Sequence, residues 1–340
     1  MEDAKELDDD SVDEQLARYY QTFIVPSIIL GVSYVLETVT NIAFGNWIAR
    51  SRYLENIIDK MTKGRGHTSL RNLVWVIYYI APAIAVFGQV LPQSVAFFHD
   101  PDGFNKNAFK NISFLVIMGV AYLLNLAFMF LWLWICFECY CFTQKFIDDH
   151  FKHTNLAGRS KEHKIEAVKR AMQHFVDNIT LMHEISSPWT VSMIIRLMCN
   201  MYRFWFQLKQ TLALSESLSS DGSAGDGDGA FGDKGAVQGA IALYITSLFF
   251  QMGMMLLVTF ASGYVGDVYV QNVVKSLRTR ISHEDDDTVS KASIDFLMLS
   301  NFYKGEAGLL FCGVEMGTEK AFYLVTALTY INSYFITPTT

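Results

Sequence analysis

The sequence predicts an all-α membrane protein, a polytopic bundle of transmembrane helices, on the basis of two observations. Of its 340 residues, 51% are hydrophobic and only 18% are charged, whereas soluble domains carry about 25% charged residues. The apolar residues also gather in continuous runs, and a helix needs about 20 such residues to cross a bilayer. A β-barrel is excluded because its strands are about 10 residues long and alternate in polarity.

Six apolar runs meet or approach the length of a membrane-spanning helix. The third is the most apolar, the second is interrupted by Pro82 and Pro92, and the fourth carries Arg196, Arg203 and Lys209. Because lipid offers no hydrogen bonds to a backbone, each run is expected to be helical. The six predicted spans cover residues 22–44, 73–98, 112–142, 189–212, 236–265 and 321–335, the last extended to about 337.

The loops between these spans differ in their basic residues, and this difference predicts the orientation. Three loops, 50–71, 145–170 and 275–304, together hold 18 Lys and Arg, whereas the alternate set holds 5. Since cytoplasmic loops carry the excess of Lys and Arg, the three rich loops are expected inside. The prediction is therefore a multi-pass membrane protein with its amino and carboxyl ends outside.

The stretches between spans have distinct compositions. The first 14 residues hold eight acids and one base, which predicts a disordered tail. Apolar residues recur at helical spacing between 165 and 182, which predicts a cytoplasmic helix. The predicted organisation is an acidic tail at 1–21, spans at 22–144, a cytoplasmic helical extension at 145–188, a span at 189–212, a disordered outside loop at 213–235, a span at 236–265, cytoplasmic helices at 266–318 and a last span at 319–340.

Few residues in the sequence point to chemistry. Cys136, Cys139 and Cys141 lack a second cysteine pair, so packing or lipidation of Cys141 is favoured over zinc. His150 and His153 share a helix face beside two acids, which is typical of a solvated face. No hydrolase, nucleotide-binding or zinc-protease motif is present. We therefore expect no enzyme activity, no metal and no cofactor, and the balanced charge outside the tail excludes a nucleic-acid partner.

Charge inside a predicted span is costly and often functional, and three charged residues within the spans stand out. Glu37 lies in the first span, and Arg196 and Arg203 lie seven residues apart on one face of the fourth. Two interpretations remain open. In the first, these side chains line a water-filled pocket. In the second, they pair with acids or extend toward the membrane interface.

The last span carries hydroxyl groups along one side. Residues at offsets of three, four, seven and eleven share one stripe of a helix, and the opposite side carries Leu324, Leu328, Ile331 and Phe335. Repeated around a symmetry axis, such a stripe forms a neutral hydroxyl-lined pore; within one subunit, it instead bonds neighbouring helices. The candidate pore-lining residues are Thr326, Thr329, Tyr330, Ser333 and Thr337.

The carboxyl-terminal third holds two motifs, a Cys-Gly turn within Phe311–Met316 and a Thr-Tyr pair at Thr329 and Tyr330. Both resemble motifs of the insect-type gustatory receptor family, in which a Cys-Gly turn precedes the last helix and a Thr-Tyr pair lies near its end. Residues 125–153 look like the family's fourth helix and its extension, and Leu181–Ile185 is similar to its linker. The likeness covers most of 125–335. The family's first helix has no counterpart among the six runs, and its closing Gln-Phe pair is replaced by Ile336 and Thr337.

The resemblance implies a ligand-gated, non-selective cation channel, built as a homo- or hetero-tetramer of related subunits. It implies a last helix split into a cytoplasmic half, 302–318, and a pore half, 319–337, and a small-molecule tastant bound among the outer halves of the other spans. Rival functions are a G-protein-coupled chemoreceptor, a transporter and a non-conducting membrane receptor. Candidate ligand-binding residues are the polar or aromatic groups within spans, Tyr78, Tyr79, Gln89, Tyr122, Asn125 and Gln251.

Overall fold

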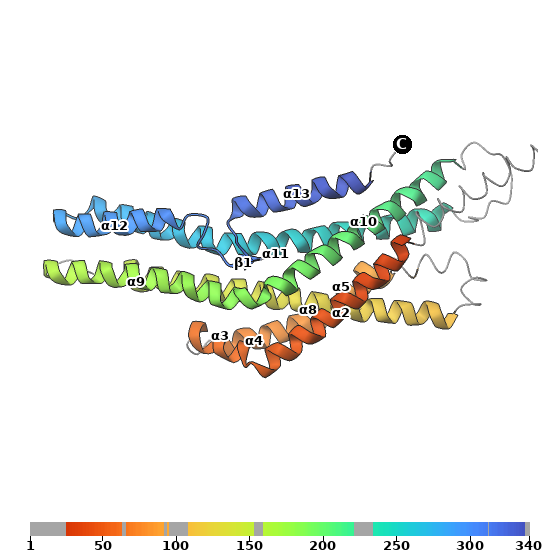
Figure 1. Ribbon diagram of the computed structural model, residues 1–340, viewed down its shortest axis with the longest axis horizontal. Helices are drawn as coiled ribbons and strands as arrows, with labels where there is room; N and C mark the ends of the chain where they lie inside the picture. Colours follow the sequence, from red (N-terminus) through yellow and green to blue (C-terminus); the bar gives the residue numbers. More distant parts are fainter. Residues whose placement is uncertain are drawn as a thin grey trace, which may run out of the picture. The chain divides into compact units, whose positions relative to one another are not determined.

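The computed structural model of the chain describes residues 25–62, 66–91, 94, 108–152, 159–220, 234–311 and 313–336. Within these residues the structure is helical, apart from short turns and one two-stranded hairpin, which confirms the all-α prediction (Figure 1). Three helical stretches, Ile28–Arg50, Leu115–Lys152 and Ile241–Ser282, are long and apolar enough to cross a membrane. They correspond to the first, third and fifth predicted spans, and the chain is a membrane protein by this criterion.

The longest helices exceed what a bilayer requires. Helix α11 has 49 residues, about 73 Å at 1.5 Å per residue, whereas the hydrocarbon core is about 30 Å thick. The five long helices are α2 (Val25–Arg50), α8 (Ala108–Ile147), α9 (Lys161–Ser186), α10 (Thr190–Ser220) and α11 (Lys234–Ser282). The shorter helices are α3 (Tyr53–Ile57), α4 (Gly66–Trp75), α5 (Ala81–Ala85), α12 (Asp287–Phe302) and α13 (Thr318–Ile336).

The second predicted span is broken into alternating α-helical and π-helical turns. The π-helical turns in this region are η3 (Val76–Ile80) and η4 (Val86–Val90), which flank α5. Pro82 has no backbone N–H, and its ring collides with the carbonyl four residues earlier in a regular helix. A wider turn relieves that collision, which accounts for η3 directly before the α5 segment that contains Pro82. Two further π-helical turns, η2 (Ile58–Thr62) and η5 (Asp148–Lys152), end α3 and α8.

The chain divides into two compact units. Unit 1 comprises Met1–Ile42, Ile84–Asn125 and Ile195–Gln251, and unit 2 comprises Ala43–Ala83, Leu126–Ile194 and Met252–Thr340. Each of α2, α8, α10 and α11 contributes residues to both units.

Unit 2 holds the predicted cytoplasmic helix, α9, which packs side by side with α12 (Figure 1). The apolar stripe expected between 165 and 182 is the buried face of α9, with Val168, Phe175, Ile179 and Met182 inside. The ring of Phe175, which is fully buried, lies 5.6 Å from that of Phe296 on α12 and 5.1 Å from that of Tyr269 on α11, centre to centre. The prediction of this helix from its period is therefore confirmed.

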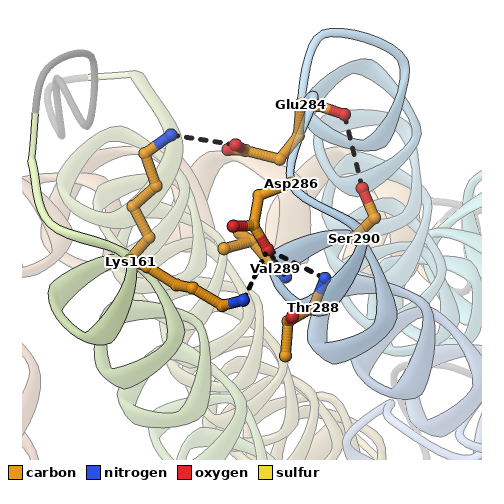
Figure 2. Close-up of polar contacts among 7 residues, drawn as sticks. Lys161, Glu284, Asp286, Thr288, Val289 and Ser290 are labelled. Carbon is orange, nitrogen blue, oxygen red and sulfur yellow. Dashed lines mark hydrogen bonds and ion pairs between the residues drawn. The ribbon is translucent and has the colours of Figure 1, made fainter.

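Charged side chains tie the first turn of α9 to the turn between α11 and α12, as Figure 2 shows. The ammonium of Lys164 lies 2.8 Å from the Glu284 carboxylate, and that of Lys161 lies 3.4 Å from the Asp286 carboxylate. Asp286 also caps α12, because its carboxylate accepts the backbone N–H groups of Thr288 at 2.9 Å and Val289 at 3.3 Å. One carboxylate thus starts α12 and anchors it to α9.

Two expectations about helical boundaries are wrong. Residues 302–318 are not a helical half of the last span, because α12 ends at Phe302 and a turn and hairpin follow. Gly305 and Gly313 take φ values of +82° and +77°, a left-handed conformation that ends regular helix. Residues 213–220 are not a loop, because α10 continues to Ser220 through Ala, Leu and Glu residues that favour helix. The tail at 1–21 lies outside the described residues, as do 221–233 of the predicted loop.

The cap predicts acid-sensitive stability. Burial raises the pKa of Asp286, but the backbone amides of Thr288 and Val289 and the Lys161 ammonium together lower it by more. The pKa of the folded state is therefore below the ordinary value of 3.8. Its stabilising contribution is therefore full above the unfolded-state pKa and is lost as pH falls through the lower folded-state pKa. We expect Asp286→Ala to lower the melting temperature at pH 7 and to differ little from wild type near pH 2. Asp285→Ala is the control, because Asp285 is the exposed neighbour of Asp286. Its melting temperature should match that of wild type at pH 7. An equal decrease in melting temperature in both variants would contradict the capping role of Asp286.

Candidate functional site

The segment that precedes α13 is a hairpin, called here the hairpin segment (residues 303–311 and 313–317). Its strands β1 (Leu310–Phe311) and β2 (Val314–Glu315) pair antiparallel, Leu310 opposite Glu315. The segment is attached to the end of α9, because Ser186 Oγ accepts the backbone N–H of Leu310 at 2.9 Å while donating to the Met182 carbonyl at 2.7 Å. Ser186 is fully buried, so removing its hydroxyl would leave the Leu310 amide without this partner.

The backbone of the hairpin segment also lies directly against the backbone of α11. A Cβ atom placed at Gly266 of α11 would lie 2.4 Å from the Cα and N atoms of Gly308. One placed at Gly263 would lie 2.7 Å from the carbonyl carbon of Gly317. Gly263 and Gly266 are three residues apart and therefore share a face of α11. Glycine at these positions is what allows the segment to approach the helix.

The residue next to this face holds the amino end of α13. Asp267 Oδ2 accepts the backbone N–H of Thr318, the first residue of α13, at 2.7 Å. The first N–H groups of a helix have no partner within it, and that end carries partial positive charge. A carboxylate from α11 thus caps a helix that follows 51 residues later.

Aromatic rings pack beside the same contact within unit 2. Trp132 and Trp189 are fully buried, with ring centres 5.2 Å apart, and Trp132 Nε1 donates to Ser262 Oγ on α11 at 2.9 Å. The ring of Phe311 lies 6.5 Å from that of Trp132. Trp189 Nε1 donates at 3.0 Å to the hydroxyl of Tyr53, which itself donates to the Ile185 carbonyl. The hairpin segment therefore packs, through Phe311, against buried tryptophans that are themselves held by hydrogen bonds.

Unit 1 holds a second feature, a chain of buried polar side chains that we call the polar seam (Glu37, Asn41, Asn125, Arg196, Asn200, Arg203, Gln207, Ser247 and Gln251). At its centre the Arg203 guanidinium pairs with the Glu37 carboxylate and lies 4.2 Å from the centre of the Tyr34 ring. Both charged side chains are almost fully buried, at 1% and 0% exposed. For Arg203, the interpretation of pairing with an acid is therefore the one observed.

The rest of the seam is made of hydrogen bonds between helices. Arg196 donates twice to Asn41 Oδ1, from Nε at 3.0 Å and Nη2 at 2.7 Å. Asn125 on α8 donates to Asn200 on α10 at 3.0 Å, and Gln251 on α11 donates to Gln207 on α10 at 2.9 Å. Among the described residues, Glu37 Oε1, Asn41 Nδ2, Arg203 Nε and Gln207 Nε2 have no hydrogen-bond partner. A buried polar group without a partner is costly, so these atoms mark where water or a polar ligand would be stabilised.

The structure places three of the predicted ligand-binding residues in unit 1 with buried side chains, namely Tyr122, Asn125 and Gln251. Asn125 and Gln251 belong to the polar seam. Tyr78 and Tyr79 instead lie in unit 2 on the surface of η3, 71% and 55% exposed. The side chain of Gln89 lies outside the described residues.

The predicted pore residues are described only in part. Thr326 is exposed on α13 and donates to the Phe322 carbonyl at 2.9 Å, and Tyr330 is 70% exposed. Thr329 and Ser333 lie in α13, but their side chains are outside the described residues, and Thr337 lies beyond the described part.

Sequence reasoning missed the residues that hold α13. Asp267 was counted as part of a cytoplasmic helical stretch, and Ser186 as part of the extension. The available signal was the pair of glycines directly before an acid, because small residues three apart on a helix favour close backbone contact. Among the described residues no three His, Cys, Asp or Glu side chains gather to hold a metal ion. No protein-family model matches the chain, and no curated protein matches it.

The glycine contact predicts opposite effects of one substitution at two positions of α11. Gly266→Ala would force a methyl group against the Gly308 backbone and should lower the free energy of unfolding by about 1–3 kcal/mol. Gly253→Ala meets nothing within 4 Å and should raise it by about 0.5–1 kcal/mol through helix propensity. Thermal unfolding of the purified variants in detergent measures both, and a shift in the same direction for both would contradict the close contact.

If Glu37 and Arg203 interact, the effects of replacing each of them on the free energy of unfolding should not add. Glu37→Met leaves the Arg203 guanidinium buried without its partner, which costs about 3–5 kcal/mol, whereas replacing both with Met is expected to recover most of that loss. Thermal unfolding of Glu37→Met, Arg203→Met and the double variant completes the cycle. Glu55→Gln is the control, because Glu55 pairs with Arg52 at the surface and should contribute little. Strict additivity would show that the two side chains do not interact.

Proposed function

We propose that the chain is a subunit of a ligand-gated, non-selective cation channel of the gustatory-receptor type, located in the plasma membrane. In this proposal it crosses the membrane six times, the carboxyl terminus lies outside, and related subunits assemble as a tetramer. A small-molecule tastant opens the channel, and no cofactor, nucleic acid or catalytic step is involved. The observation that supports it most is α13, whose amino end is capped by Asp267 while Thr326 and Tyr330 are exposed.

The exposure of Thr326 and Tyr330 favours the first of the two roles proposed for the hydroxyl stripe, the pore wall. Bonding within one subunit would cover the stripe, yet Thr326 is exposed and the Tyr330 side chain is 70% exposed in the single chain. Phe322 and Tyr323 on the same helix are 59% and 61% exposed. A helix of 19 residues that a single chain leaves so open is suited to contacts with further copies and a shared aqueous axis.

The polar seam is the proposed ligand-binding region. It combines buried donors and acceptors without partners, which a polar small molecule could satisfy, and it contains two of the residues predicted from sequence, Asn125 and Gln251. A ligand opens the channel only if it binds the open arrangement more tightly than the closed one. We propose that α11 carries the change, since the same helix supplies Gln251 to the seam and Asp267 to the amino end of α13.

The proposal predicts a current that the chain itself conducts. Expressed in a cell of low background conductance and screened with tastants, it should give a cation current that persists when G-protein signalling is blocked. Thr329→Leu and Ser333→Leu should each lower the single-channel conductance, because an apolar side chain replaces a hydroxyl at the proposed pore wall. Patch-clamp recording of the ligand-evoked current measures this.

Leu324→Ile on the opposite side of α13 is the matched control and should leave the conductance unchanged. A current that disappears when G-protein signalling is blocked would favour the G-protein-coupled receptor instead. A strictly monomeric particle in detergent, or a conductance indifferent to both stripe variants, would also contradict the proposed pore.

A further inference from the structure

Two histidines from separate elements meet in unit 2. His150 lies in η5, directly after α8, and His174 lies in the middle of α9. Nε2 of His150 is 3.1 Å from Nδ1 of His174, and the ring centres are 5.1 Å apart. The sequence alone directs attention to His153 as the partner of His150, but His153 lies outside the described residues.

We propose that His150 and His174 form a binding site for a divalent transition metal of the Zn²⁺ class. Two imidazole nitrogens on one tetrahedral Zn²⁺, each about 2.0–2.1 Å from the ion, lie about 3.3 Å apart. The observed separation of 3.1 Å is within a few tenths of an ångström of that value. Binding requires both rings to turn so that the two lone pairs, instead of sharing a proton, are directed at one ion.

Packing fixes the positions from which both rings project. The His150 ring lies 4.7 Å from the ring of Phe146, which is buried at 6% exposure. His174 precedes Phe175, the fully buried residue that packs against α12. His174 itself is exposed and His150 is half-buried, so an ion can reach them from solvent. A preorganised and accessible pair loses little entropy on binding.

The neighbouring charges neither forbid nor enforce a cation at this position. The Asp149 carboxylate attracts positive charge at His150, and the Arg280 guanidinium opposes it. Asp148 is paired with Lys152 at 2.8 Å. With two nitrogen ligands from the protein, water molecules would complete the coordination. The nitrogen ligands select Zn²⁺, Ni²⁺ or Cu²⁺ over Mg²⁺ and Ca²⁺, which prefer oxygen.

Occupation of the site would link the end of α8 to α9. The two histidine side chains are joined by one hydrogen bond, and a bound metal ion would replace it with two coordinate bonds. The proposal stands independently of channel function, because binding can be measured on the purified chain without any current.

The test is a titration of the purified full-length chain in detergent with ZnCl₂, in competition with a colorimetric zinc indicator at pH 7.5. We expect one saturable Zn²⁺ per chain, affinity at least tenfold weaker in His174→Ala and in His150→Ala, and no competition by MgCl₂. His174→Cys should retain binding, because a thiolate also coordinates Zn²⁺. This rescue separates a lost ligand from a damaged fold.

His163→Ala is the matched control, since His163 is an exposed histidine on the same helix. It should bind Zn²⁺ as wild type does. Absence of saturable binding by the wild-type chain would overturn the proposal. So would equal affinity in wild type, His150→Ala and His174→Ala, because the metal would then be held by other side chains.

Discussion

The amino end of α13 is fixed on α11 by contact between backbones, and the surrounding architecture depends on that approach. Gly263 and Gly266 remove the side chains that would keep the hairpin segment away, and Asp267 then reaches the first amide of α13. Gly308 and Gly317 lie opposite these two glycines, and a Cβ at Gly308 would also collide with the Met316 carbonyl within the hairpin segment. Ser186 and the Trp132–Trp189 core hold the hairpin segment from α9 and α8.

This constraint explains why one end of α13 is rigidly placed while its exposed face is left uncovered. A capped helix end cannot slide without breaking a charge-assisted hydrogen bond. Any change that reaches α13 must therefore pass through α11 or the hairpin segment. In the proposed channel, α11 is suited to that role because it also bonds Gln207 through Gln251.

The sequence predicted features that depend on local periodicity or composition. Continuous apolar runs located α2, α8 and α11, and the spacing from Ile165 to Met182 located the buried face of α9. Features that join distant parts of the chain were not predictable in this way. Asp267 and Thr318 are 51 residues apart, and His150 meets a histidine 24 residues away on another helix. The family resemblance implied a helical half at 302–318, whereas Gly305 and Gly313 take left-handed conformations that end regular helix and allow the hairpin.

The arrangement of α13 in the assembled protein shows directly whether a helix fixed on α11 lines a shared pore. A cryo-electron microscopy structure of the full chain in lipid would place every α13 relative to its neighbours. We expect Thr318 N within hydrogen-bonding distance of Asp267, and several copies of α13 around one axis with Thr326, Thr329 and Ser333 facing water. A structure in which the hydroxyl stripe is sealed inside one subunit, with no aqueous path where subunits meet, would contradict it.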